Sequence, residues 1–368
     1  MTVAGHPKIT AKKQLEGLGV YKPGKPIEEV KRELGLTQII KLASNENPLG
    51  YSERAKEAMI REMDNITLYP EGTAPMLAQK LAERLQVKPE QIIVGNGSDE
   101  ILHLLTRSYI RQGDEAIMAD VTFPRYETNV RIEGGVPIHV PLVNGVHDLD
   151  GMLAAITEKT RMIFVCNPNN PTGTIVGKAE MQSFIEKVPD HILLVIDEAY
   201  FEYVTDENYL DSVSLIGSHQ NLVVLRTFSK IYGLAALRVG YGVMNEAFVQ
   251  ELMKVKEPFN TNRLAQAAAL ASLDDEQFLQ NCKKKNETGR RYIENEVEKL
   301  GLGYFSSQGN FVMVKLPCSG DDVFKALLKK GIIVRSGTVL GYPETIRVSV
   351  GTDEENRAFI AALREIIG

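Results

Sequence analysis

Leu222-Val223-Val224-Leu225-Arg226-Thr227-Phe228-Ser229-Lys230 is a short apolar run that leads into a hydroxyl-rich turn ending in a lysine. An apolar run without polar alternation is typical of a strand buried on both faces of a sheet. Lys230 then stands at the end of that strand, eight positions before Arg238. Burial and a nearby cation favour the neutral, nucleophilic amine that forms imines with carbonyl groups. A Ser-Lys pair alone more often marks a surface loop, so its significance depends on the other motifs.

Further apolar runs alternate with helix-like stretches between residues 77 and 255, as in a parallel or mostly parallel sheet covered on both faces. We predict strands at Ile92–Val94, Ala116–Ala119, Val136–Val140, Met162–Cys166, Ile192–Ile196, Leu222–Leu225 and Val239–Val243. Helices are predicted at Pro75–Leu85, Asp99–Arg111, Lys178–Lys187 and Glu246–Lys254. The pattern therefore indicates an α/β fold with a large, mostly parallel sheet.

The pattern changes after Pro258, where residues 263–300 predict one or two long helices. A smaller α/β module follows, with strands at Phe311–Leu316, Ile332–Val334 and Ile346–Val350 and helices at Asp321–Lys330 and Asp353–Ile367. A chain of 368 residues exceeds one usual core. We predict an N-terminal arm (1–36) that packs with the small domain, a large domain (37–262) that holds the ligand, and a small C-terminal domain (263–368).

Composition excludes several classes of function. The formal net charge is −6, and the only Lys/Arg run is Lys283–Lys285, so no nucleic-acid partner is expected. Three well-separated cysteines without CxxC spacing predict neither disulfides nor a metal site. The sequence contains no signal-peptide pattern and no run of 18 apolar residues. We therefore expect a cytoplasmic protein that does not contact membranes.

Polar residues cluster where the predicted strands end, which is where ligands bind in open α/β sheets. Gly97 and Ser98 open a helix and provide the free N–H groups that bind a phosphate ester, although a plain helix cap is an alternative. Asn170 lies between two prolines that stiffen its loop. Asp197 ends an apolar strand, where a carboxylate needs a cationic partner or a proton.

Aromatic residues complete this set. Tyr200 lies three positions after Asp197, and Phe123 offers a flat face for stacking on a ring, with Tyr126 in the same turn as an alternative. A phosphate site, a carboxylate for a ring nitrogen, donors for a ring oxygen and an amine for an aldehyde match one ligand. That ligand is pyridoxal 5'-phosphate. A nicotinamide cofactor is disfavoured, because Gly95-Asn96-Gly97 lacks the third glycine of GxGxxG.

Three motifs carry a family resemblance: Tyr21-Lys22-Pro23-Gly24-Lys25-Pro26, Leu42-Ala43-Ser44-Asn45-Glu46-Asn47-Pro48 and Ile346-Arg347-Val348-Ser349-Val350-Gly351. With them, essentially the whole chain resembles the histidinol-phosphate aminotransferases, a branch of the aspartate-aminotransferase-like (type I fold) pyridoxal-phosphate enzymes. The resemblance implies that Lys230 forms the internal aldimine and carries the proton in a 1,3 shift. It places Asp197 at the pyridinium nitrogen, Tyr200 and Asn170 at the ring oxygen, and Phe123 on the ring.

Around the cofactor phosphate, the resemblance implies Gly97, Ser98, Thr227, Ser229, Arg238 and, from the second subunit of a homodimer, Tyr69. The substrate's anionic end would be held by Arg347 and Arg335, with Tyr21 and Asn47 lining that pocket; a surface salt bridge is the alternative for Arg335. The implied reaction of histidine biosynthesis converts histidinol phosphate and 2-oxoglutarate to imidazole-acetol phosphate and glutamate. A threonine-phosphate-type decarboxylase and an aromatic amino acid aminotransferase remain alternative functions.

Overall fold

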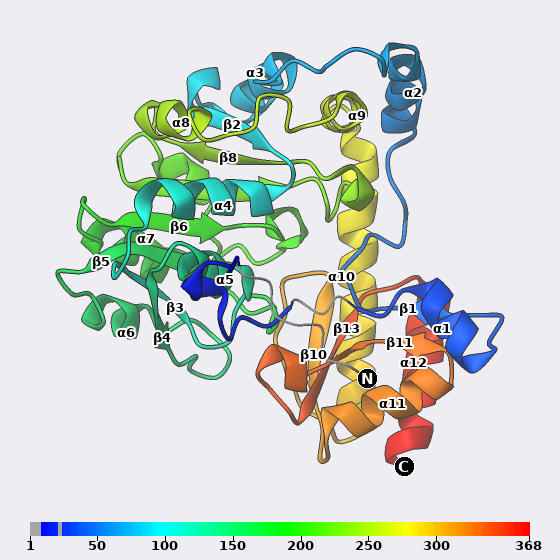
Figure 1. Ribbon diagram of the computed structural model, residues 1–368. Coiled ribbons are helices and arrows are strands. Elements are labelled where there is room, and N and C mark those ends of the chain that lie inside the picture. The colour runs from blue at the N-terminus through cyan, green and yellow to red at the C-terminus, as the bar shows by residue number, and fades with distance from the viewer. Residues whose placement is uncertain (1–8, 21–23) are drawn as a thin grey trace.

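The computed structural model describes residues 9–20 and 24–368, so Tyr21 lies outside the described residues. Figure 1 shows a large unit and a small unit, with the long helix α10 running between them. The large unit is built on a seven-stranded sheet of order β2-β8-β7-β6-β5-β3-β4. Its strands are β2 (Ile92–Gly95), β3 (Glu115–Ala119), β4 (Val136–Val140), β5 (Thr160–Cys166), β6 (Leu193–Asp197), β7 (Leu222–Thr227) and β8 (Gly240–Met244).

Every pairing in this sheet is parallel except those of β8, which runs antiparallel to both β2 and β7. Helices cover the sheet: α3 (Pro75–Leu85), α4 (Ser98–Tyr109), α5 (Arg125–Ile132), α6 (Leu149–Ala154), α7 (Lys178–Lys187) and α8 (Glu246–Met253). α2 (Glu53–Glu62) packs against α9 (Arg263–Ser272), which also contacts α3. Alternate strand residues enter different cores, with Leu194 and Ile196 on one face and Leu193 and Val195 on the other. Burial on both faces explains the unbroken apolar runs.

The small unit has its own core around an antiparallel sheet of order β12-β13-β10-β9. Its strands are β9 (Tyr304–Phe305), β10 (Phe311–Lys315), β12 (Arg335–Ser336) and β13 (Thr345–Ser349), and its helices are α11 (Gly320–Lys329) and α12 (Asp353–Ile367). β1 (Ile40–Lys41) pairs in parallel with β11 (Ile332–Ile333). α1 (Ile27–Leu34) packs beside this two-stranded sheet, where its Val30 contacts Ala43 and Ile333.

Helix α10 (Glu276–Lys299) links the two cores. Leu279 and Cys282, near its start, pack in the core of the large unit, whereas Ile293 and Val297, nearer its end, pack in that of the small unit. The domain boundary predicted between residues 262 and 263 stays a prediction, since α9 also packs in the core of the large unit.

The α/β fold with a large, mostly parallel sheet is confirmed. The predicted bounds of α3, α7 and α12 agree with the structure, and residues 263–300 form the two helices α9 and α10. Among the described residues, no helix is both long and apolar enough to cross a bilayer. The expected cytoplasmic location stays a prediction.

Candidate active site

A pocket of about 430 Å³ lies between the two units, beyond the carboxyl ends of β5, β6 and β7 and at the start of α4. Its volume is typical of a site for a small organic ligand. Most of the residues predicted from the sequence line it: Ser98, Phe123, Asn170, Asp197, Tyr200, Thr227, Ser229, Lys230, Arg238, Arg335 and Arg347. These residues come from positions 98 to 347, so only the fold brings them together.

Lys230 lies just beyond the end of β7, with its Nζ 5.5 Å from the centroid of the Tyr200 ring. Burial, together with the positive charge of Arg347, lowers the pKa of Lys230 to about 8. About a tenth of the amine is therefore neutral at pH 7, far more than for an ordinary lysine, and a neutral amine is a nucleophile and a base.

Asp197 is the last residue of β6, and its carboxyl group is oriented by two donors. The Tyr126 hydroxyl donates to Oδ2 at 2.8 Å, and the Ala199 amide donates to Oδ1 at 3.1 Å. Burial raises the pKa of Asp197 to about 6. The group is therefore ionised at neutral pH, and its desolvation costs folding free energy. Such a carboxylate has a strong preference for a cationic partner.

Tyr126 is fully buried, and its ring stacks on Phe164 with centroids 4.8 Å apart. Burial raises the pKa of Tyr126 well above its ordinary range, so the hydroxyl keeps its proton and remains a donor to Asp197. Phe123, by contrast, lines the pocket. Tyr126 is thus packed beneath the pocket, whereas Phe123 is at its surface, and which of them stacks on a ligand stays a prediction.

Tyr200 is held by Asn45, which the sequence analysis did not select. The Asn45 side chain donates to the Tyr200 hydroxyl at 3.0 Å and accepts from the Ser349 hydroxyl at 2.9 Å. Asn45 has a left-handed backbone (φ 55°) that asparagine tolerates better than most residues, and its side chain is buried. It therefore joins the N-terminal segment, the large sheet and β13 at one point.

The start of α4 and the turn after β7 form a polar cradle at one end of the pocket. Gly97 precedes the helix with φ 78°, and a Cβ placed on it would lie 2.8 Å from Arg238 Nη2. Arg238 donates to the Ser229 hydroxyl at 3.2 Å, and the Ser229 amide donates to the Thr227 hydroxyl at 3.0 Å. Free N–H groups, hydroxyls and a guanidinium together make an anion site.

Two arginines of the small unit face the pocket from adjacent strands. Arg335 on β12 and Arg347 on β13 are direct partners in the antiparallel register. Arg347 is buried, and it donates to the Asn170 side chain at 2.5 Å and to the Ala43 carbonyl at 3.0 Å. The pair forms a second anion site in the pocket, separate from the cradle around Arg238.

Three of the predicted residues that the structure describes are not part of the pocket lining: Gly97, which adjoins it at the start of α4, and the more distant Asn47 and Tyr69. Asn47 lines a neighbouring cavity of about 250 Å³, and its side chain donates to the Ile231 carbonyl at 2.7 Å and to Cys282 Sγ at 3.3 Å. Tyr69 is 77% exposed and stacks on Phe259 at the surface. The roles assigned to both residues stay predictions.

Besides Asn45, the sequence analysis missed two charged residues in this region, and it named Tyr126 only as an alternative to Phe123 for ring stacking. Asp99 and Arg125 both line the pocket. Asp99 Oδ2 lies 3.6 Å from Arg238 Nη2, and Arg125 contacts His103 on α4 at 2.8 Å. The sequence analysis gave Asp99 no role in the site, and no local pattern marks Arg125.

A lysine and an aspartate at neighbouring strand ends, beside two anion sites, place the protein in a known class. The chain belongs to the class I and II aminotransferases, whose family model matches residues 37–363. It is an enzyme of the transaminase class, as the sequence predicted.

Within this family, the chain groups with the histidinol-phosphate aminotransferases. A curated relative of that name from Brevibacillus brevis is 49% identical over 356 residues, which cover 97% of this chain and 98% of the relative. A crystal structure of histidinol-phosphate aminotransferase from Sinorhizobium meliloti, in complex with pyridoxal-5'-phosphate, matches with a TM-score of 0.90 and 28% identity. That match covers 99% of this chain and 98% of the other.

The fold is also shared with an enzyme of different activity. The crystal structure of L-threonine-O-3-phosphate decarboxylase from Porphyromonas gingivalis matches with a TM-score of 0.79 and 24% identity, covering 89% of this chain and 99% of the other. The fold alone therefore does not separate amino transfer from decarboxylation.

Proposed function

We propose that this chain transfers the amino group of histidinol phosphate to 2-oxoglutarate in histidine biosynthesis, with pyridoxal 5'-phosphate as its cofactor. One observation carries the proposal: a half-buried lysine, a buried aspartate and a pair of arginines line a single pocket. The names of the relatives that are about half identical over nearly the whole chain support this substrate. The proposal also gives a role to Lys230, Asp197, Arg335 and Arg347 together.

The residues of the pocket fit this cofactor. Gly97 leaves space where a Cβ would meet Arg238, which suits a phosphate group beside Ser98, Thr227 and Ser229. Asp197 would face the ring nitrogen, and Tyr200 and Asn170 would bind the ring oxygen. Phe123 would cover the ring, and Lys230 would bond to the aldehyde carbon. When bound, the cofactor supplies a ring that accepts the electron pair left behind when the substrate loses its proton.

Lys230 has two tasks in this proposal. Its lowered pKa leaves the amine free to bond to a carbonyl carbon and, once displaced by the substrate's amine, to act as a base. It would remove the proton from the substrate carbon next to the nitrogen. It would then return that proton to the former aldehyde carbon of the cofactor. Positioned proton transfer of this kind contributes roughly a hundred- to ten-thousand-fold in rate.

Asp197 acts through its charge. Tyr126 and Ala199 hold both carboxylate oxygens in place, so the negative charge has a fixed direction before a ligand arrives. A carboxylate opposite a ring nitrogen favours the protonated nitrogen, and a charge-assisted hydrogen bond contributes about 1.5–3 kcal/mol. Tyr126 thus serves as a positioning residue for Asp197.

Arg335 and Arg347 would bind the anionic end of each substrate in turn. The planar guanidinium forms paired hydrogen bonds with either a carboxylate or a phosphate. Two such groups on adjacent strands suit a site that must accept the phosphate of histidinol phosphate and a carboxylate of 2-oxoglutarate. Asn170, which accepts from Arg347, would connect this site to the cofactor ring.

The proposal is tested with purified protein reconstituted with pyridoxal 5'-phosphate. Histidinol phosphate, phenylalanine and tyrosine are offered as amino donors with 2-oxoglutarate, and formation of glutamate and release of CO₂ are both measured. Histidinol phosphate should be the best donor, and Lys230→Ala should abolish turnover and the imine absorbance. A preference for phenylalanine or tyrosine would indicate an aromatic aminotransferase. CO₂ release without glutamate would indicate the decarboxylase.

We further propose that the enzyme is a homodimer in which Tyr69 reaches the cofactor phosphate of the second subunit. Large apolar side chains are exposed along α2, the following segment and nearby loops, which is unusual for a free surface. They are Ile60, Met63, Ile66, Leu68, Tyr69, Met76 and Phe259. Tyr69 stacks on Phe259 and is not among the residues that line the pocket of its own chain.

This part of the proposal predicts separate effects for two changes. Ile66→Lys should shift the protein from dimer to monomer in light scattering and weaken cofactor binding. Tyr69→Phe should leave the dimer intact, because the ring remains, but should weaken cofactor binding through the lost hydroxyl. A wild-type protein that is monomeric at micromolar concentration would exclude the shared site.

A further inference from the structure

The two strands that end at the pocket carry a buried ion pair on their opposite face. Along β6, Ile196 packs in one core and Asp197 faces the pocket, so Glu198 returns to the face of Ile196. Along β7, Val224 lies on that same face and Thr227 lines the pocket, so Arg226 points away from it. Glu198 and Arg226 therefore lie beneath the sheet, one residue from Asp197 and one from Thr227.

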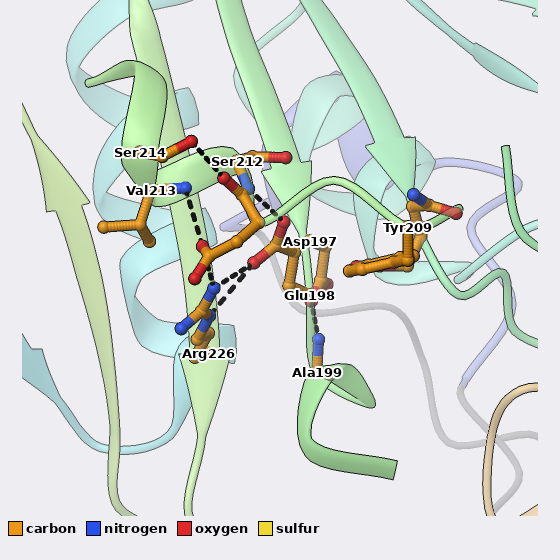
Figure 2. Close-up of polar contacts among 10 residues, drawn as sticks. Asp197, Glu198, Ala199, Tyr209, Ser212, Val213, Ser214 and Arg226 are labelled. Atoms are coloured by element: carbon orange, nitrogen blue, oxygen red, sulfur yellow. Dashed lines mark hydrogen bonds and ion pairs between the residues drawn. The ribbon is translucent and has the colours of Figure 1, made fainter. Parts of the chain in front are cut away.

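The pair is closely bonded and almost completely buried. Arg226 donates to Glu198 Oε2 from both Nε, at 3.0 Å, and Nη2, at 2.7 Å. Figure 2 shows these contacts, with Glu198 next to Asp197 on the same strand. The exposed fraction is 2% for the Arg226 side chain and 0% for Glu198. The guanidinium carbon also lies 3.5 Å from the centroid of the Phe201 ring.

Further hydrogen bonds extend the pair into the neighbouring loop. Arg226 Nη2 donates to Asp211 Oδ1 at 2.6 Å, and the Ser212 amide donates to Glu198 Oε1 at 3.1 Å. Asp211 also caps the short helix η5 (Ser212–Leu215) by accepting from the Val213 amide. The network thus ties together β6, β7 and the loop that leads to η5.

The energetics of this arrangement do not favour a purely stabilising role. Both ions lose their hydration, and replacing a buried ion pair by apolar residues of similar volume is often neutral or stabilising. Hydrogen bonds of fixed length and angle, however, restrict the register and tilt of the two strand ends more than apolar contacts do. The positions of Asp197 and Thr227 depend on the positions of those strand ends, because each residue lies on one of them.

We propose that Arg226 and Glu198 are positioning residues that set the direction of the Asp197 carboxylate and the placement of Thr227 at the cofactor site. This inference rests on the proposed cofactor-dependent function. Neither Arg226 nor Glu198 lines the pocket. Their influence on Asp197 and Thr227 therefore passes through the backbone between adjacent residues. The Glu198 amide, which donates to the Leu225 carbonyl at 2.9 Å, completes the link between the two strands.

The test replaces the pair together, as Glu198→Leu with Arg226→Met, so that neither member of the pair is left as an unpaired buried charge. Asp211 is 49% exposed and remains solvated. The matched control replaces a second buried pair, Arg290 and Glu294 on α10, whose contact is 3.0 Å, as Arg290→Met with Glu294→Leu.

Three quantities are measured for each protein: unfolding in urea, the dissociation constant for pyridoxal 5'-phosphate, and the pH midpoint of the bound cofactor's absorbance. The Glu198/Arg226 double variant should unfold near the wild-type midpoint, but its dissociation constant should rise at least about 10-fold. The pH midpoint of the bound cofactor's absorbance should also shift, because that midpoint depends on the charges and hydrogen bonds around the cofactor ring. The control pair should change neither cofactor property.

An unchanged dissociation constant and pH midpoint in the folded double variant would overturn the inference. Where the double variant does not fold, Arg226→Lys decides, because lysine keeps the charge but lacks the guanidinium fork. It should weaken cofactor binding by a few-fold, and wild-type affinity would again overturn the inference. A wild-type protein that does not bind pyridoxal 5'-phosphate would instead refute the proposed function.

Discussion

Replacing Asp197 by asparagine should increase the stability of the cofactor-free protein and lower the affinity of the protein for the cofactor. Burial raises the pKa of Asp197 from 3.8 to about 6, so the folded protein binds this proton more tightly than the unfolded chain does. Stability from this group is therefore lost as the pH rises from 3.8 through 6. Integrating the two titrations gives a cost of about 2 kcal/mol at pH 5 and about 3 kcal/mol at pH 8.

Asparagine is uncharged and nearly the same shape, so it removes that cost. The free energy of unfolding, measured in urea on the cofactor-free proteins, should favour Asp197→Asn by about 3 kcal/mol at pH 8, and by less at pH 5. Its affinity for pyridoxal 5'-phosphate should fall, since a charge-assisted bond worth about 1.5–3 kcal/mol is weakened. Asp190→Asn, at an exposed position, controls for the loss of one negative charge. A stability gain that is equal at both pH values, or absent, would refute this reasoning.

Three other substitutions have distinct outcomes. Lys230→Met should stabilise the cofactor-free protein by about 3 kcal/mol at pH 7, because burial lowers the folded pKa to about 8 from 10.5; urea titrations should show the gain fading as the pH rises from 8 to 10.5. Gly97→Ala, which places a Cβ 2.8 Å from Arg238, should weaken cofactor binding; Gly301→Ala, with a similar φ (72° against 78°) but open space, should cost only stability, about 1–2 kcal/mol. Arg347→Ala should raise the KM for both histidinol phosphate and 2-oxoglutarate in steady-state assays, and an effect on one substrate alone would show separate anchors.

Local patterns identified most of the large sheet because its central strands are buried on both faces and therefore read as apolar runs. Leu222–Leu225 and Ile192–Ile196 were recognised on this basis, and each strand continues to the polar residue that faces the pocket. The antiparallel direction of β8 was not visible, because strand direction depends on how the chain returns from Lys230 to Gly240. Short strands such as β12 carry too few residues for a periodicity.

The site was predictable where a functional residue ends a recognisable strand, as Asp197 does. It was less predictable where position depends on a single backbone angle. Asn45 and Asn47 belong to the same motif, but the left-handed turn at Asn45 directs that side chain to Tyr200. Tyr126 and Phe123 share one turn, yet burial of Tyr126 beneath the pocket was decided by the packing of Phe164.

The adjacent arginines on β12 and β13 stand on a sheet whose hydrophobic core is separate from that of the cofactor residues. Under the proposed function, the residues that would bind the substrate's anionic end and those that would hold the cofactor are therefore carried by different cores, and Arg347 bridges them through its hydrogen bond to the Asn170 side chain. If Arg335 binds the substrate as proposed, substitutions around it should alter which anion is preferred while leaving the strand ends near Asp197 and Lys230 in place. The architecture allows a new specificity to evolve, or to be engineered, while the catalytic apparatus is retained.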